Sequence, residues 1–299
     1  MAGEARTDDR RMIRRIAGRF KLLLEMIKFS HTLFALPFAL TGMLFAAGGM
    51  PRVEVLLWIL AAMVGARTAA MTVNRIADAA IDAKNPRTAM RHLPAGTVGF
   101  AEAWLLTLAG SALTVFAAWK LNPLCLALSP VALGAVFLYP FLKRFTLFCH
   151  IFLGICLSAA PLGAYMAVTG RLDPAILPLA LAVVLWVAGF DILYALQDLE
   201  FDSSEGLHSI PRRLGVGKSL LLAKLMHGAA YGLFALQVVL FKLGVYYWAG
   251  LAIVFALLVY EHSLVKKDDL SRLDAAFFTM NGIISVVVFA ATALDYWAR

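Results

Sequence analysis

Apolar runs of about 20 residues recur along nearly the whole of this 299-residue chain. About 20 predominantly apolar residues in a helix cross the hydrocarbon core of a bilayer, so each run predicts a transmembrane helix. Nine runs can be placed, at approximately 31–49, 54–73, 100–119, 123–142, 146–168, 174–196, 218–241, 244–262 and 274–295. The sequence therefore predicts an all-α fold, a polytopic membrane bundle of nine transmembrane helices.

The composition excludes a soluble protein. Hydrophobic residues make up 62% of the chain, charged residues only 15%, and the mean hydropathy is +0.80, whereas about a quarter of the residues of soluble domains are charged. The net charge of +8 raises nucleic-acid binding as an alternative, but the basic residues cluster in short segments between apolar runs. We expect membrane lipid as the surroundings and no nucleic-acid partner.

The distribution of Lys and Arg predicts the topology. The N-terminal segment and the segments after the second, fourth, sixth and eighth helices hold 20 of the 27 Lys and Arg residues, and the remaining connections with the C-terminus hold five. The last two, Arg67 and Lys224, lie inside predicted helices. Because cytoplasmic loops carry the excess of positive charge, we expect a cytoplasmic N-terminus and an external C-terminus.

The first 29 residues are polar and basic. Between residues 11 and 29, apolar residues follow helical spacing with Arg and Lys between them, which predicts an amphipathic helix on an anionic membrane surface. A signal peptide is the alternative, but the basic region is too long and the next run continues as a full span. We expect residues 1–29 to form this cytoplasmic segment and residues 30–299 a single intramembrane domain.

Two acidic stretches follow apolar runs of even number. Asn74, Asp78 and Asp82 recur every fourth residue at the end of the second helix, so they share one helical face. Asp191, Asp198 and Asp202 at the end of the sixth helix lie at i, i+7 and i+11, close to one face. Both stretches are expected to open on the cytoplasmic side, followed by the long loops 84–99 and 203–218, and long loops in a tight bundle are usually functional. The domain thus divides into helices one to four with the first motif and helices five to nine with the second.

Four carboxylates gathered at a membrane boundary repel one another unless a cation joins them. Oxygen ligands without His or Cys are typical of a hard ion such as Mg²⁺, which leaves positions for substrate phosphates. Basic residues on the same side suit a diphosphate; they are Arg75, Lys84, Arg87, Arg91, Lys143, Arg144, Arg212 and Arg213. Solvated loop charges are the alternative, but the aspartates keep helical register, and Asp191 lies deep in an apolar run.

Other polar residues carry weaker indications. Arg67 lies two helical turns before Asn74 and needs an anion within the membrane, and Tyr139 and Lys143 lie one turn apart at the end of the fourth helix. Asn281 lines the same cavity or forms a hydrogen bond between helices, and the sequence leaves both open. The three cysteines and six histidines show no metal-ligand spacing, and we assign them no role.

These residues resemble the UbiA superfamily of intramembrane aromatic prenyltransferases over essentially the whole chain after residue 25. The resemblance rests on Asn74-Arg75-x-x-Asp78-x-x-x-Asp82, on Asn85-Pro86-Arg87-Thr88 continuing to Gly96, on Tyr139 and Lys143, and on Asp191-x-x-Tyr194-x-x-Gln197-Asp198-x-x-x-Asp202. It is closest to the bacterial 4-hydroxybenzoate polyprenyltransferase-like branch and its menaquinone-pathway relatives. It implies a UbiA-type bundle in the bacterial inner membrane with a cytoplasmic active site.

The resemblance also implies residue roles. Asn74, Asp78, Asp82, Asp198 and Asp202 would hold Mg²⁺ and the diphosphate of a polyprenyl donor. Arg67, Arg75, Arg87, Arg91 and Lys143 would contact the diphosphate. Asp191, Tyr139, Tyr194 and Lys143 would act near the reacting carbons. The reaction is then electrophilic substitution on the ring of an aromatic carboxylic acid.

Three functions remain open at this stage. The leading hypothesis is Mg²⁺-dependent transfer of a polyprenyl group to 4-hydroxybenzoate in ubiquinone-type quinone biosynthesis. A close alternative changes the acceptor to 1,4-dihydroxy-6-naphthoate in menaquinone biosynthesis. The remote alternative is an ion-coupled transporter, which would place polar residues near the bilayer midplane rather than at helix ends. The sequence does not predict an oligomeric state.

Overall fold

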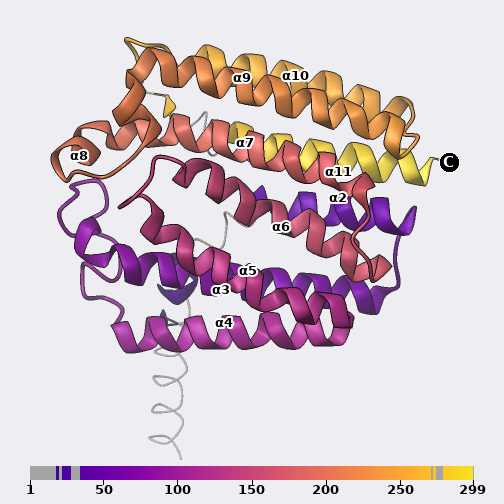
Figure 1. Ribbon diagram of the computed structural model, residues 1–299, viewed down its shortest axis with the longest axis horizontal. Coiled ribbons are helices and arrows are strands. Elements are labelled where there is room, and N and C mark those ends of the chain that lie inside the picture. Colours follow the sequence, from indigo (N-terminus) through magenta and orange to yellow (C-terminus); the bar gives the residue numbers. More distant parts are fainter. Residues whose placement is uncertain (1–17, 20–21, 28–33, 271, 274–278, 299) are drawn as a thin grey trace, which may run out of the picture.

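The structure, a computed structural model, describes residues 18–19, 22–27, 34–270, 272–273 and 279–298 (Figure 1). Most of the predicted interfacial helix at 11–29, the start of the first apolar run and residues 274–278 lie outside this description. The described residues are predominantly helical and form no β-strand beyond an isolated bridge between Lys266 and Asp269. The predicted all-α class is confirmed.

Each of the nine apolar runs corresponds to a helix of the described chain. Seven segments are long and apolar enough to cross a membrane: α3 (Val53–Asp82), α4 (Phe100–Leu121), α5 (Pro123–Leu142), α6 (Cys149–Thr169), the segment Pro174–Ser204 that contains α7 (Leu177–Ala195), α9 (Ile210–Leu240) and α10 (Val245–Leu264). Two shorter apolar helices, α2 (Leu36–Ala47) and α11 (Asn281–Trp297), complete the set.

Helix α7 forms the centre of the bundle. Its Trp186 is fully buried and makes edge-on contacts with Phe38 of α2 at 5.1 Å and with Phe190 at 4.9 Å between ring centroids. Phe234 of α9 stacks on Phe38 at 5.7 Å. Aromatic pairs at these separations add stabilisation beyond the area that they bury. The last turns of α7, which carry Asp191, therefore extend from a firmly packed core.

Helices α3 and α4 approach each other closely through two glycines. A Cβ atom added to Gly65 would lie 2.7 Å from the carbonyl oxygen of Gly110, and one added to Gly110 would lie 2.7 Å from that of Gly65. Small residues at helix contacts allow backbones to come together in membranes, where no hydrophobic effect drives helices into contact. This contact fixes the helix that ends in the first acidic motif.

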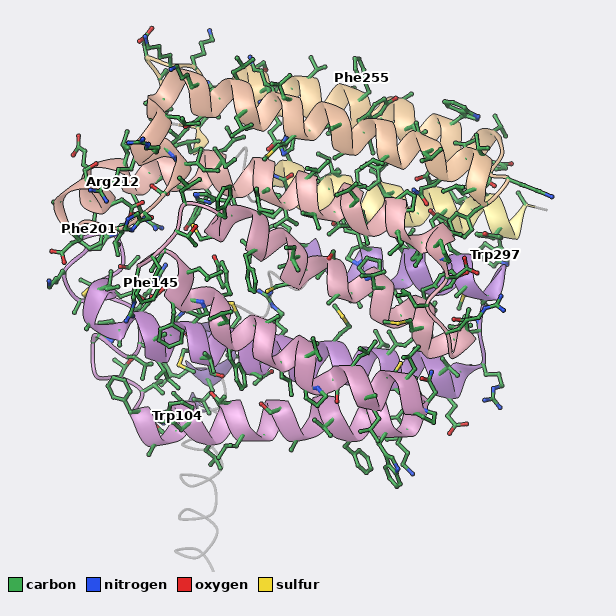
Figure 2. The ribbon with its side chains drawn as sticks, in the orientation of Figure 1. Trp104, Phe145, Phe201, Arg212, Phe255 and Trp297 are labelled. Carbon is green, nitrogen blue, oxygen red and sulfur yellow. The ribbon has the colours of Figure 1, made fainter. Side chains whose placement is uncertain are left out.

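The outer surface of the bundle is apolar. Figure 2 shows Trp104 of α4 and Phe255 of α10 pointing outward from opposite sides of the bundle, and their exposed fractions are 51% and 56%. A soluble protein buries side chains of this size, whereas a lipid-facing surface presents them. The exposed aromatic residues thus agree with the spans predicted from hydropathy.

The two acidic motifs lie at one end of the bundle and the C-terminus lies at the other (Figure 1). The short helix α8 (Leu199–Ser204) marks the acidic end. Figure 2 shows Phe201 and Arg212 at this end and Trp297 at the opposite one. The prediction that even-numbered spans end on the same side is confirmed for the segments that carry the motifs.

The loop predicted at residues 203–218 is shorter than expected. Helix α9 already begins at Ile210, with Pro211 in its first turn and the Ser209 side chain accepting a hydrogen bond from the backbone N–H of Arg212. Gly215 interrupts the helix with a positive φ of 73°, a conformation that glycine adopts without steric cost. Within the predicted loop, Pro211 and Gly215 are therefore an N-terminal helical proline and a kink.

Candidate active site

The first acidic motif occupies the last turns of α3, as predicted. Asp78 and Asp82 are buried, with exposed fractions of 4% and 5%, and Asn74 is half-buried one turn earlier. A carboxylate so far removed from water is costly unless it has a charged or hydrogen-bonding partner. The surroundings of these two residues therefore decide what the motif can do.

The second motif is not one continuous α-helix, which differs from the helix that its spacing predicted. Helix α7 ends at Ala195, a 3₁₀ turn spans Leu196–Asp198, and α8 starts at Leu199. A 3₁₀ turn has three residues per turn instead of 3.6, so it rotates the following residues relative to an α-helix. Asp191, Asp198 and Asp202 consequently lie on three successive elements, and all three are half-buried.

The two motifs are linked through Asp198. Asn85, which follows the first motif, donates to Asp198 Oδ1 at 2.9 Å. Arg87 donates to both oxygens of the same carboxylate, from Nε at 3.0 Å and from Nη2 at 2.5 Å. A bidentate pair of this kind fixes orientation as well as charge. The loop after the first motif therefore closes over the second motif, as the convergence argument from topology predicted.

Further contacts join the loops at this end. Lys84 and Glu205 form an ion pair at 2.7 Å between the loop after α3 and the loop after α8. The backbone N–H of His208 donates to the carbonyl oxygen of Lys143 at 2.7 Å. Segments from three distant parts of the sequence thus meet at one end of the bundle, which is the arrangement that a shared site requires.

Three of the four motif carboxylates are each paired with their own basic residue. Lys143 Nζ lies 2.7 Å from Asp78 Oδ2, Arg91 Nη1 donates to both oxygens of Asp82 at 2.7 Å, and Arg87 holds Asp198. These partners were predicted to bind a diphosphate. In the described part of the chain, no group of three or more His, Cys, Asp or Glu residues is arranged to hold a metal ion, so the predicted five-residue ligand set is not assembled in this arrangement.

The donor chemistry of the site nevertheless fits a hard divalent cation. The motifs offer carboxylate and amide oxygens, which are the ligands that Mg²⁺ prefers. Asp78 Oδ1 is buried and has no hydrogen-bond partner among the described residues, a costly state for a carboxylate oxygen. The basic partners of Asp78, Asp82 and Asp198 could turn toward a diphosphate if a cation replaced them.

Arg87 also reaches Tyr194. Its Nη1 donates to the Tyr194 hydroxyl at 2.7 Å, and its guanidinium lies 5.1 Å from the centre of the Tyr194 ring. Burial by itself lowers the pKa of Arg87, but the hydrogen bonds to Asp198 and Tyr194 and the nearby charges outweigh it, so the pKa is raised above its ordinary value. Arg87 therefore remains a cation at any pH at which the protein folds.

The remaining predicted residues divide into two groups. Tyr139 lies close enough to Asp191 and Asp78 for their charges to act on its phenol, which places it in the site. Arg75 is buried and turned toward the N-terminal segment, where its Nε donates to the Met26 carbonyl oxygen at 3.4 Å. Arg67 lies seven residues before Asn74 on α3, about 10 Å deeper along the helix axis. Arg67 is therefore not gathered with Arg87, Arg91 and Lys143 around the carboxylates, whereas Arg75 is still close enough to Asp78, Asp82 and Arg91 for their charges to interact.

One buried polar contact was missed by the sequence analysis, and the partner in a second was not identified. His150 Nδ1 lies 2.7 Å from Asp191 Oδ2, although no histidine was assigned a role. Glu261, which is fully buried, accepts a hydrogen bond from Asn281 Nδ2 at 3.0 Å; of the two possibilities left open for Asn281, the structure therefore supports the hydrogen bond between helices. The isolated Asp191 inside an apolar run predicted a functional residue, but no periodicity reveals which distant helix supplies its partner.

Comparison with known proteins places this arrangement in context. Residues 35–283 match the model of the UbiA prenyltransferase family. Among similar proteins, the 4-hydroxybenzoate octaprenyltransferase of Vibrio atlanticus is 31% identical over 89% of this chain and 93% of its own length. The 4-hydroxybenzoate octaprenyltransferase of Nitrosospira multiformis is 34% identical over 87% of this chain and 89% of its own.

Solved structures show the same fold. A UbiA homologue from Aeropyrum pernix K1, solved in its apo form, superposes with a TM-score of 0.82 at 36% identity, over 89% of this chain and 98% of its own. A UbiA homologue from Archaeoglobus fulgidus bound to DMAPP and Mg²⁺ gives a TM-score of 0.66 at 21% identity, over 93% and 99% of the two chains. The latter likeness establishes the fold alone.

Proposed function

Because this chain belongs to the UbiA prenyltransferase family, we propose that it transfers a polyprenyl group from a polyprenyl diphosphate to the ring of 4-hydroxybenzoate. The proposal rests on one observation above all: the acidic motifs of α3 and of α7–α8 meet at one end of the bundle, joined by Asn85 and Arg87 to Asp198. The similarity to 4-hydroxybenzoate octaprenyltransferases over nearly their whole length favours this acceptor.

We assign Mg²⁺ to the oxygen atoms of the two motifs. Asn74, Asp78, Asp82, Asp198 and Asp202 would hold the ion, and the unpartnered buried oxygen of Asp78 supports this assignment. When bound, Mg²⁺ neutralises charge on the diphosphate and so favours its departure from the prenyl carbon.

The basic residues bind and orient the donor. Lys143, Arg87 and Arg91 each hold a motif carboxylate in the present arrangement, and each is within reach of a diphosphate placed between the motifs. Their positive charges stabilise the negative charge that develops on the leaving diphosphate. The three cations already lie at the motifs, and each would turn from its carboxylate to the diphosphate when the ion and the substrate enter.

The acceptor occupies the deeper part of the site. Tyr139 and Asp191 line the region beneath the carboxylates, near the point where the prenyl carbon becomes cationic. We propose that Arg67, a further two turns into the bundle, meets the carboxylate of the aromatic acid, because it lies on the same helix as the first motif and deeper than the cations that hold the motif carboxylates. This assignment differs from the diphosphate role expected from the sequence, since Arg67 lies about 10 Å from Asn74 along α3.

A membrane bundle suits this chemistry for two reasons. The polyprenyl chain is soluble in lipid, and the apolar outer surface of the bundle is in contact with it. The helices also exclude water from an allylic cation that water would otherwise capture. We further propose that the acidic end faces the cytoplasm, because the basic segments of the chain lie there.

Product formation tests the function. Membranes that contain this protein would receive a long-chain polyprenyl diphosphate, Mg²⁺, and either 4-hydroxybenzoate or 1,4-dihydroxy-6-naphthoate. We expect prenylated 4-hydroxybenzoate, and we expect EDTA to abolish it. Asp78→Asn and Asp198→Asn should each reduce turnover by at least about 10²-fold, whereas Glu200→Gln, an exposed acid on the intervening α8, should keep it.

If product forms from 1,4-dihydroxy-6-naphthoate alone, the acceptor of this enzyme is the naphthoate and not 4-hydroxybenzoate. Full activity in both Asp variants would overturn the assignment of the motifs.

A further inference from the structure

The Asp191 carboxylate is held by a histidine that the proposed chemistry does not yet use. His150, the second residue of α6, is 3% exposed, and its Nδ1 lies 2.7 Å from Asp191 Oδ2 on α7. The Asp191 side chain keeps 16% of its surface open. The histidine is therefore buried, and of the two side chains only Asp191 is exposed enough to contact a molecule in the site.

The protonation of the imidazole follows from its second contact. The backbone N–H of Ile210, the first residue of α9, donates to His150 Nε2 at 3.3 Å. A backbone N–H has no lone pair, so Nε2 must be the unprotonated nitrogen, and the proton of the neutral ring resides on Nδ1. Nδ1–H then donates to Asp191, and this requires Asp191 Oδ2 to be an acceptor.

The second oxygen of Asp191 is left for the substrate. No hydrogen bond to Oδ1 is present in the described part of the chain, and the charge of Asp191 acts on the phenol of Tyr139 beside it. A carboxylate with one oxygen fixed by a buried donor and the other open to the site is oriented for proton transfer.

We infer that His150 is a positioning residue: it holds Asp191 in the orientation and charge state in which Oδ1 removes the proton from the prenylated ring carbon. This inference rests on the proposed function. The bond between the prenyl carbon and the diphosphate oxygen breaks, and its electron pair leaves with the diphosphate. The ring forms the new carbon–carbon bond, and its C–H proton passes to Asp191 Oδ1 while the C–H electron pair restores aromaticity. Water takes the proton from Asp191 after product release.

The same contacts connect the base to the loop above the site. Ile210 follows directly on the loop 205–209, and that loop contacts Lys143 and Lys84 through His208 and Glu205. Because His150 touches both Ile210 and Asp191, the position of the carboxylate depends on the position of this loop. We therefore expect the base to be oriented correctly when the loops over the diphosphate are closed.

Two substitutions of similar shape separate a hydrogen-bond role from a packing role. In His150→Asn, the amide nitrogen occupies about the position of Nδ1 and still donates to Asp191. His150→Leu is branched at the same carbon as asparagine, is close to histidine in volume and has no donor. We expect kcat to fall about 10²-fold in His150→Leu, because a misplaced general base loses part of its contribution, and to stay within a few-fold of the wild type in His150→Asn, with KM for both substrates unchanged.

An isotope effect provides a readout that packing alone would not change. With 4-hydroxybenzoate deuterated at the two ring carbons beside the hydroxyl-bearing carbon, we expect a primary isotope effect on kcat to appear or grow in His150→Leu, since proton removal becomes slower. His150→Asn should behave as the wild type. If His150→Leu does not fold, His150→Phe, which keeps a ring without nitrogens, takes its place with the same expected result.

The outcomes distinguish the two proposals. A wild type that forms no prenylated product would refute the proposed function. A wild type that is active, with equal kcat in the Asn and Leu variants or an unchanged isotope effect in His150→Leu, would refute the role of His150 and leave the function intact.

Discussion

Lys143 and Asp78 form an ion pair of 2.7 Å across 65 residues of sequence, joining the end of α5 to the end of α3. Asp78 is buried, and Lys143 supplies the one charged partner that its Oδ2 atom has in the described structure. The lysine thus stabilises the carboxylate before substrate binds, and a cation at the same place can afterwards contact the diphosphate. Lys143 should therefore contribute both to the stability of the folded protein and to binding of the diphosphate.

Lys143→Met should weaken both roles. We expect KM for the polyprenyl diphosphate to rise and kcat to fall by a combined factor of about 10²-fold or more, because a cation that stabilises the leaving group is lost. Loss of the partner of a buried carboxylate should also lower the thermal stability of the detergent-solubilised protein. Lys218→Met, which removes an exposed lysine at the same end of the bundle, should change neither quantity. Equal behaviour of the two variants would contradict the assignment.

Substitution of Arg67 should affect the two substrates differently. If its guanidinium meets the carboxylate of the aromatic acid, Arg67→Met should raise KM for 4-hydroxybenzoate by about 10- to 100-fold, corresponding to a lost charged hydrogen bond, and leave KM for the polyprenyl diphosphate nearly unchanged. Steady-state kinetics with each substrate varied in turn measures this difference. A rise confined to the diphosphate would instead restore the role that the sequence predicted for Arg67.

The ion pair between Lys84 and Glu205 joins the loop after α3 to the loop after α8. Both side chains are partly exposed, at 62% and 29%, so the pair contributes only about 0.2–1 kcal/mol. Lys84→Glu and Glu205→Lys should each reduce turnover at low salt by up to about five-fold, which corresponds to that energy, and the exchanged double variant should recover most of it. The loss should shrink as salt screens the charges. A double variant no better than the worse single one would show that the contact itself is not used.

Most of the fold could be predicted from the sequence because hydropathy and helix length are local properties. The nine apolar runs, the shared end of both motifs and the helical register of Asp78 and Asp82 all follow from them. Asp191 is a second kind of case: its isolation in an apolar run predicted a functional residue, but its partner His150 lies 41 residues away on another helix. No local pattern encodes that pairing, since it depends on how α6 and α7 pack.

The break in the second motif could not be predicted for a related reason. Leu196, Gln197 and Asp198 include no Gly or Pro and keep a helical pattern, yet they form a 3₁₀ turn. Asp198 is held there by Arg87 and Asn85, which belong to a loop more than a hundred residues earlier. In contrast, the start of α9 was signalled locally by Ser209 and Pro211, a typical N-cap and first-turn pair, which was interpreted as part of a loop.

Asn281 and Glu261 allow a test of stability away from the site. Both are fully buried, and Asn281 Nδ2 donates to Glu261 Oε1 at 3.0 Å between α11 and α10, while Glu261 Oε2 has no hydrogen-bond partner in the described residues. Removing the donor leaves a buried carboxyl group still less satisfied, so Asn281→Leu should destabilise the protein by about 1–3 kcal/mol. Replacing both groups removes the unsatisfied partner as well, and Asn281→Leu with Glu261→Leu should therefore recover much of that loss, because two apolar groups of similar shape can substitute for a buried polar pair.

Thermal unfolding in detergent measures both effects, and the turnover of each folded variant at a temperature below its transition should remain near that of the wild type. A double variant less stable than the single one would mean that Glu261 contributes to stability through a partner other than Asn281. His227, whose Nδ1 lies 3.8 Å from Glu261 Oε2, is then the candidate partner.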